Sequence, residues 1–185
     1  MYGDRLTVAL MLDAPLRWLL DPLSDGLGSV LRVSVEVGDL PLDPSRFVDE
    51  SRGQVRAREL LERASGAVPV NPLRRVVMVV EKDGYVEGFN FVFGVARPGW
   101  GGLVFTARLR PGFYGQPDNP LLFAVRVLKE VLHELGHSLG LGHCMDRRCV
   151  MSFSNSVWEV DRKNPAFCRR CALELERMYP GLTAP

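Results

Sequence analysis

The three histidines of this chain, His133, His137 and His143, fall within one stretch of eleven residues. Residues four apart lie on the same face of a helix, so His133 and His137 can point at a single ion. Gly140 can adopt the left-handed conformation that ends a helix, which lets His143 return as a third ligand. Glu134 stands beside the first ligand, where a general base must be to reach a metal-bound water. Three neutral imidazoles leave one open position on a tetrahedral zinc, so the pattern predicts a catalytic zinc site.

The four cysteines all follow this motif in two close pairs, C-x4-C and C-x2-C, with eighteen residues between the pairs. Such spacing is typical of a structural zinc held by four thiolates. Two disulfides are the main alternative, but a C-x2-C pair is a poor structural disulfide and a chain without a secretion signal meets a reducing compartment. A thioredoxin-like redox pair of Cys168 and Cys171 is disfavoured, because no βαβ pattern surrounds these residues. A nucleophilic Cys144 paired with His143 is also disfavoured, because each residue fits one of the two predicted metal sites better. The predicted zinc ligands are Cys144, Cys149, Cys168 and Cys171.

The composition fits one compact domain. The 185 residues, 46% of them hydrophobic, suffice for a substantial core. The net charge of +1 does not favour nucleic acid or an acidic membrane as a partner. No apolar run approaches the roughly 20 residues of a membrane span, and the uncharged run at residues 6–12 is too short for a secretion signal. We therefore expect a cytoplasmic chain with no membrane partner.

Apolar patterning in the first 110 residues predicts a sheet. Residues 76–80 are continuously apolar, as in a strand covered on both faces. Residues 30–37 alternate between apolar and polar, as in a half-buried strand. Further strands are expected at residues 7–12, 89–96 and 103–109.

Helices are expected between and after these strands. Residues 16–20 predict a helical turn that leads into a loop at residues 21–26, and the charged residues 49–64 predict a surface helix that backs the sheet. A short helix is expected at residues 171–178.

The longest predicted helix carries the histidine motif. It follows Asn119, a good N-cap, and has Pro120 as its first residue. Arg126 and Glu130 fall on its histidine side and are expected to form a surface ion pair, although Glu130 is also placed to orient a metal ligand. The predicted buried stripe consists of Leu121, Val125, Leu128, Leu132, Leu135 and Leu139.

The segment from His133 to Cys171 resembles a known family. The motif H-E-x-x-H-x-x-G-x-x-H, followed by a methionine, is that of the metzincin metallopeptidases. The cysteine after the third histidine, the C-x4-C-x-M continuation and the later C-x2-C pair are similar to those of the archaemetzincins. Residues 108–115 and 153–155 also look like that family, whereas the first hundred residues resemble it only in the order of elements.

The resemblance implies a role for each of these side chains. The three histidines would bind a catalytic zinc and the four cysteines a structural zinc, which makes two zinc ions per chain. Glu134 would act as general base and proton shuttle, and Met151 would form a turn beneath the metal without binding it. The implied function is that of a zinc metallopeptidase, of endopeptidase or aminopeptidase type.

The resemblance also implies an α+β fold. Its parts are a mixed, twisted β-sheet with an antiparallel edge strand, a backing helix, an active-site helix and a small C-terminal subdomain held together by the cysteine zinc site. Residues 1–185 would form a single catalytic domain, with subdomains at residues 1–140 and 141–185. The edge strand would bind an extended peptide by main-chain pairing. Its binding residues are expected to be Phe89, Asn90, Phe91, Val92 and Phe93.

One position departs from several metzincin families, which place a tyrosine two residues after the turn methionine to help hold the intermediate. Phe153 occupies that position here and has no hydroxyl. Loss of one such donor costs about 3 kcal/mol, so we expect either a substitute donor or a slow, selective peptidase. A narrow cleft would limit a monomeric enzyme to short or unfolded peptides.

The rival function is a zinc-containing module that binds nucleic acid or protein and keeps a vestigial histidine site. Its basis is the basic rim that arginines form around the cysteine pairs. A simpler interpretation is that these arginines offset the negative charge of four thiolates on zinc. We favour the simpler interpretation and expect a peptide, not a nucleic acid, as partner. The arginines are Arg147, Arg148, Arg169 and Arg170.

Overall fold

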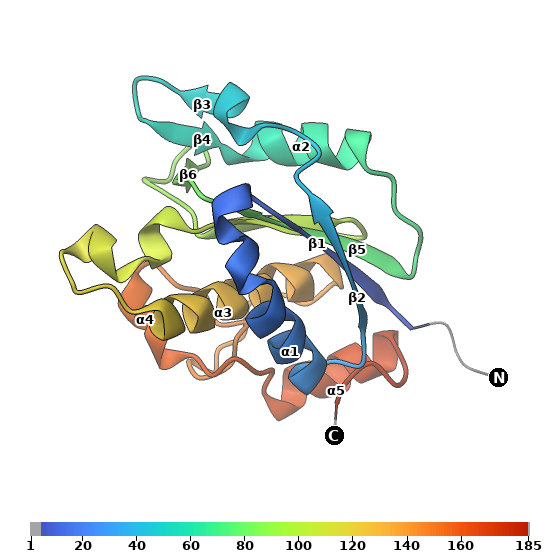
Figure 1. Cartoon of the computed structure of the whole chain (residues 1–185). Helices are drawn as coiled ribbons and strands as arrows, with labels where there is room; N and C mark the ends of the chain where they lie inside the picture. Colours follow the sequence, from blue (N-terminus) through green and yellow to red (C-terminus); the bar gives the residue numbers. More distant parts are fainter. Residues whose placement is uncertain (1–4, 185) are drawn as a thin grey trace.

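The computed structural model of this chain describes residues 5–184. A five-stranded sheet with the order β2-β1-β5-β8-β7 forms its centre (Figure 1). Its first four strands are parallel, and β7 pairs antiparallel with β8 at the edge. The predicted α+β fold with a mixed sheet and an antiparallel edge is therefore confirmed. The strands are β1 (Thr7–Leu12), β2 (Ser34–Asp39), β5 (Arg74–Val80), β7 (Gly94–Arg97) and β8 (Gly101–Phe105).

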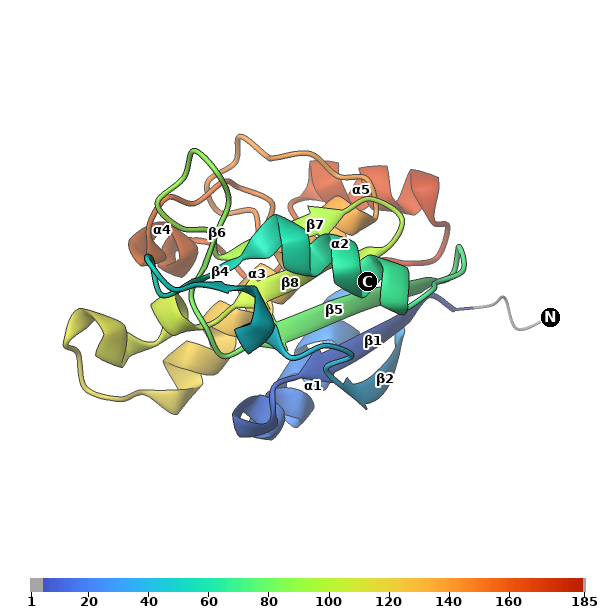
Figure 2. The same cartoon turned by 90° about the horizontal axis from the view of Figure 1, so that it is seen from above.

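Helices cover both faces of this sheet, as the two views in Figures 1 and 2 show. The helices α1 (Leu20–Val30) and α3 (Pro120–Ser138) pack on one face, and α2 (Ala57–Ala67) packs on the other. After α3, the chain continues into α4 (Val157–Arg162) and α5 (Arg169–Met178). Within residues 5–184, no helix has both the length and the apolar character that crossing a bilayer requires.

The central strand β5 shows why two layers of helix are needed. Val77 and Val79 contribute to the core beneath α1 and α3, whereas Val76, Met78 and Val80 contribute to the core beneath α2. All five side chains are fully buried. The expectation of a strand covered on both faces is thus confirmed.

Short elements connect these layers. A second sheet has the order β3-β4-β6, and turns of 3-10 helix lie before α1, before β3 and between β8 and α3. Their bounds are η1 (Ala14–Leu19), η2 (Pro44–Phe47), β3 (Val48–Asp49), β4 (Gln54–Arg56), β6 (Gly84–Tyr85), η3 (Ala107–Leu109) and η4 (Pro111–Tyr114).

The loop expected at residues 21–26 is wrong, because this segment belongs to α1. Leu23 and Leu27 are fully buried, so an apolar stripe continues through the supposed loop. Gly26 is a packing residue rather than a turn signal. A β-carbon at Gly26 would lie only 2.4 Å from the Leu128 side chain of α3.

Three other boundaries also differ from expectation. β2 begins at Ser34 rather than at residue 30, because α1 extends through Val30. Residues 49–56 form a small hairpin before α2, so the helix expected at residues 49–64 starts eight residues later. β8 ends at Phe105, because the following residues form η3. The short C-terminal helix is confirmed, since α5 includes residues 171–178.

α3 begins where the sequence predicted, but its buried residues differ from the predicted stripe. The Asn119 side chain accepts a hydrogen bond from the backbone N–H of Leu122 at 3.0 Å, so the N-cap is confirmed. The predicted stripe is buried only toward its C-terminal end, from Leu132 onward, and Leu121 is 76% exposed. The chain around α4 packs on the opposite side of α3, which leaves most of the helix buried all round.

The predicted surface pair between Arg126 and Glu130 is wrong, because both side chains are buried. The Arg126 guanidinium donates to both carboxylate oxygens of Asp161 at 2.7 Å and to the Leu109 carbonyl at 3.0 Å. Glu130 instead pairs with Lys163. The sequence pattern of α3 contains no sign that another segment covers this face.

Arg126→Met should destabilise the fold. The substitution leaves the buried Leu109 carbonyl and the partly buried Asp161 carboxylate without their partner, which we expect to lower the free energy of unfolding by about 2–3 kcal/mol. Urea denaturation followed by circular dichroism measures this change. Arg63→Met, at an exposed position of α2, is the control and should stay within about 0.5 kcal/mol of wild type. Equal stability of the two variants would show that the buried contacts contribute little.

Candidate functional site

The three histidines converge at the C-terminal end of α3. His133 and His137 lie one turn apart on this helix, and Gly140, with φ of 104°, reverses the chain so that His143 comes back toward them. Their ligand nitrogens lie within 4.8 Å of one another. The structure therefore brings together all three of the predicted metal ligands.

Backbone carbonyls determine which nitrogen of two imidazoles faces the centre of this cluster. The Nδ1 atoms of His133 and His137 lie 2.8 Å from the carbonyl oxygens of Val150 and Leu141, respectively. A carbonyl can only accept, so each Nδ1 donates its proton and each Nε2 keeps a free lone pair. These two Nε2 atoms face each other at 3.0 Å. Two lone pairs at this distance repel unless a cation lies between them, so the arrangement fits a metal ion.

The protonation states of the imidazoles suit the same interpretation. Burial lowers the pKa of His133, His137 and His143, and the positive charge of Lys163 lowers each pKa further. All three rings are therefore neutral at pH 7. Neutral imidazole is the form that binds zinc, and three such ligands leave an open coordination position.

Glu134 lies where α3 crosses the edge of the sheet, and it is 4% exposed. Two glycines permit this approach. A β-carbon at Gly94 in β7 would lie 2.4 Å from the Glu134 carboxylate, and one at Gly102 in β8 would lie 2.7 Å from the Glu134 β-carbon. Burial, with a smaller effect of the Glu130 charge, raises the pKa of Glu134 well above its usual value, whereas Lys163 opposes this rise.

Met151 packs against the same helix. Its side chain is fully buried, and its sulfur would lie 2.4 Å from a β-carbon placed at Gly136. The Met151 carbonyl accepts a hydrogen bond from the backbone N–H of Cys144 at 2.9 Å. The turn at Met151 thus connects the histidine cluster with the cysteine cluster.

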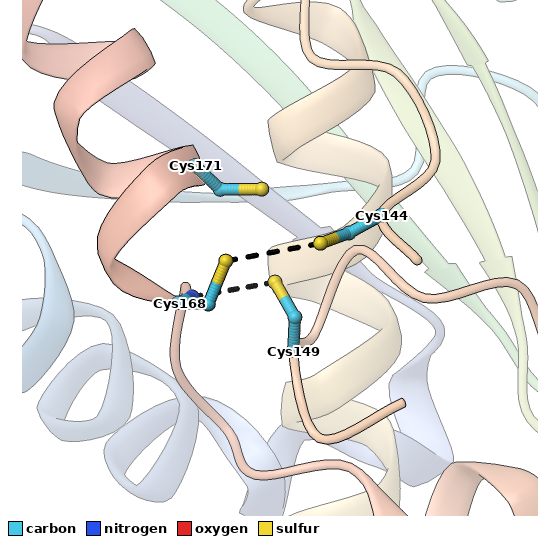
Figure 3. Close-up of side chains that lie close together, drawn as sticks. All are labelled: Cys144, Cys149, Cys168 and Cys171. Carbon is cyan, nitrogen blue, oxygen red and sulfur yellow. Dashed lines mark hydrogen bonds between the residues drawn. The ribbon is translucent and has the colours of Figure 1, made fainter. Parts of the chain in front are cut away.

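The four cysteine sulfurs form a second cluster, with all four Sγ atoms within 4.8 Å of one another (Figure 3). The four thiols are free, and the Sγ atoms of Cys144 and Cys168 lie 3.7 Å apart, so the disulfide alternative finds no support. Burial raises the pKa of Cys149 to about 11 and also raises the pKa of Cys171. Several thiols this close would repel as thiolates, so the donor set fits a metal that takes the place of their protons.

The histidines and Glu134 line a cavity of about 820 Å³. One wall comes from β7 and the segment before it, and a second wall comes from residues 153–155 and Lys163. The Phe153 ring lies 5.1 Å from the His143 ring, centroid to centroid. The cavity is therefore large enough for several residues of an extended peptide.

The edge strand predicted at residues 89–96 is wrong in its extent, because β7 spans only Gly94–Arg97. The chain from Phe89 to Phe93 forms no regular strand. Hydrogen bonds outside the main sheet stabilise its conformation. The Arg52 guanidinium donates to the Phe89 and Asn90 carbonyls, and the Val92 N–H donates to the Gly84 carbonyl. The five residues Phe89, Asn90, Phe91, Val92 and Phe93 nevertheless line the cavity.

Sequence reasoning missed several residues of this site. Lys163 lies twenty residues after the last histidine and matches no motif, so the sequence contains no sign of it. The carbonyls that hold the imidazoles are backbone groups, which side-chain patterns do not reveal. Gly94 falls in the strand predicted at residues 89–96, where a glycine is a known mark of close approach by another segment. Gly102 falls just before the strand predicted at residues 103–109, so no such mark was visible there.

Comparisons with known proteins agree with this geometry. The model of the family described as peptidase family M54 matches residues 68–177. This chain belongs to that family. The archaemetzincin of Methanopyrus kandleri is 50% identical over 135 residues, which cover 72% of this chain and 73% of that protein. The resemblance to the archaemetzincins is thus confirmed.

Two solved structures match nearly the whole fold of this chain. The crystal structure of the Methanopyrus kandleri archaemetzincin matches with a TM-score of 0.79 at 38% identity, over 96% of this chain and 97% of that chain. A zinc-dependent peptidase from Methanocorpusculum labreanum also matches with a TM-score of 0.79, at 30% identity, over 91% of this chain and 99% of that chain.

Gly94→Ala should disturb the position of Glu134. The new methyl group would clash with the Glu134 carboxylate and with the Leu103 carbonyl, at 2.4 and 2.6 Å. We expect a loss of roughly 1–3 kcal/mol of stability, as for overpacking in a core, measured by chemical denaturation. Gly28→Ala is the control, because nothing lies within 4 Å of a β-carbon there. A Gly94→Ala variant as stable as the control would contradict the close packing of Glu134 on the sheet.

Proposed function

We propose that this chain is a zinc-dependent metallopeptidase that hydrolyses peptide bonds with Glu134 as general base. The observation that carries this proposal is the pair of imidazole Nε2 lone pairs that face each other beside a buried carboxylate in one cavity. His133, His137 and His143 would hold the catalytic zinc. When bound, zinc supplies a Lewis acid that polarises the scissile carbonyl, acidifies water and favours the ionised form of Glu134.

The residues of the chain would perform the remaining tasks. Glu134 would accept a proton from the attacking water and pass it to the leaving amine. The carbonyls of Val150 and Leu141 would keep the His133 and His137 rings in one tautomer and orientation, which raises the basicity of both ligands. Met151 would support the helix from below without binding the metal.

The cavity favours an extended peptide as substrate. In the main sheet, as formed by residues 5–184, β7 is hydrogen-bonded only to β8, and both β7 and the segment before it line the cavity. A peptide strand can pair with such a free edge through its backbone, which positions the substrate without demanding a particular sequence. Short or unfolded peptides meet this requirement, because a folded protein offers few free strands.

A second zinc would be held by Cys144, Cys149, Cys168 and Cys171 in a structural role. These four side chains come from the turn near Met151 and from the start of α5, so the ion would join the two segments. The Arg170 guanidinium donates to the Cys144 sulfur at 3.5 Å. This contact supports charge compensation, rather than nucleic-acid binding, as the role of a nearby arginine.

Glu134→Gln should abolish the general base and keep its shape. We expect peptide hydrolysis to fall by about a hundredfold to ten-thousandfold, while zinc content stays at the wild-type value. Cleavage of a mixture of unfolded peptides, followed by mass spectrometry, measures this loss. Peptides with blocked N-termini in the same mixture separate an endopeptidase from an aminopeptidase. Undiminished cleavage by the variant would disprove the assigned role of Glu134.

Metal analysis tests the two proposed zinc sites separately. We expect about two zinc ions per purified wild-type chain and about one in His133→Ala, because only the histidine site would lose its ion. Cys171→Ala should also lose one ion, and its melting temperature should fall, since the sulfur site joins α5 to the rest of the chain. One ion in wild type, unchanged by His133→Ala, would mean that the histidine site binds no zinc.

A further inference from the structure

A buried lysine forms part of the wall of the active-site cavity. Lys163 follows α4 directly, its side chain is 1% exposed, and its ammonium pairs with the Glu130 carboxylate at 3.4 Å. Both residues line the same cavity as the three histidines and Glu134. Burial of an ammonium and a carboxylate is costly even when the two groups pair, so the position of this ion pair calls for a functional explanation.

The lysine stands close to the proposed reaction centre. Glu130 and Glu134 are four residues apart on α3, so their β-carbons are about 6 Å apart on one face of the helix. Lys163 binds the first of these carboxylates. Lys163 and the three histidines line one cavity, so the charge of the ammonium lies near the proposed metal ligands.

The bonding of Lys163 differs from that of its buried neighbour Lys129. The Lys129 ammonium donates to the carbonyls of Val160 and Asp161 at 3.1 Å, and Lys129 does not line the cavity. Among the residues that the structure describes, the Lys163 ammonium has Glu130 as its one hydrogen-bond partner for three N–H groups. Lys129 therefore connects α3 to the end of α4. Across the described residues, the Lys163 ammonium uses only one contact, to Glu130, and so has N–H donors to spare.

The cavity has no other buried cation in the described part of the chain. Arg58 and Arg97 also line the cavity, but both are exposed to solvent. Phe153, beside His143, has no hydroxyl to stabilise negative charge. A fixed charge in a low-dielectric wall acts more strongly than a solvated one and needs no reorganisation during the reaction.

We propose that Lys163 is the fixed cation of this cavity, positioned by Glu130, and that it stabilises the negative charge that develops on the carbonyl oxygen of a substrate bound at the histidines. Lys163 acts through the field of its charge at the cavity wall, and Glu130 is the residue that positions it. The inference rests on the proposed peptidase function. It explains how a site with phenylalanine at position 153 is able to stabilise an oxyanion.

The test compares lysine variants by two readouts. Lys163→Met removes the charge and keeps an apolar stem, and Lys163→Met with Glu130→Gln also avoids an unpaired buried carboxylate. Lys129→Met is the matched control, because it removes a buried lysine that joins the same two segments outside the cavity. The readouts are kcat and KM for an unfolded peptide and the affinity of the zinc-loaded protein for a phosphinic peptide, an anionic mimic of the tetrahedral intermediate.

We expect both Lys163 variants to lose on the order of ten- to a hundredfold in kcat and in affinity for the phosphinic peptide, with KM and zinc content unchanged. Lys129→Met should lose stability but change neither kcat nor phosphinic-peptide affinity by more than about threefold. Equal behaviour of the Lys163 double variant and Lys129→Met would overturn the inference.

The affinity measurement separates this inference from the proposed function. If wild type cleaves no peptide, the peptidase proposal fails, but binding of the phosphinic peptide still reports the cation. If wild type binds the phosphinic peptide more tightly than the Lys163 double variant does, the result would then support the fixed cation alone. Equal affinity of wild type and the double variant would overturn the inference.

Discussion

Two hydrogen bonds to backbone carbonyls determine how the histidine cluster of this molecule is arranged. They fix the tautomers of His133 and His137, so that two lone pairs point at one another across 3.0 Å. The carbonyls belong to Val150 and Leu141, in the segment that follows the helix, so the histidine cluster depends on the path of the chain after α3. The turn at Gly140 and the packing of Met151 maintain that path.

The sheet makes the second contribution, because it permits a carboxylate to be buried beside the histidines. Gly94 and Gly102 let α3 approach β7 and β8 closely enough for Glu134 to lie against them. The same contact places Glu134 next to the free edge of the sheet. In the proposed function, one junction between helix and sheet would therefore set the positions of both the peptide substrate and the general base.

The sequence predicted which side chains cluster better than it predicted the boundaries of the elements. The spacing of His133, His137 and His143 on a helix and its following turn was enough to predict that these three rings meet. The errors arose where distant segments decide the outcome. The sequence alone suggests that Gly26 is a turn residue, but in the structure Leu128 packs against it. The sequence also suggests that Arg126 is a surface residue, but the segment around Asp161 covers it. Lys163 has no local pattern at all, because its role depends wholly on the fold.

X-ray absorption spectroscopy at the zinc edge tests the central claim most directly. In fully loaded protein, half of the zinc should have nitrogen ligands at about 2.0–2.1 Å and half should have four sulfur ligands at about 2.3 Å. The nitrogen contribution should contain the outer-shell signals of imidazole rings and should disappear when the three histidines are replaced by alanine. A spectrum with sulfur ligands alone would contradict a metal centre at the histidines.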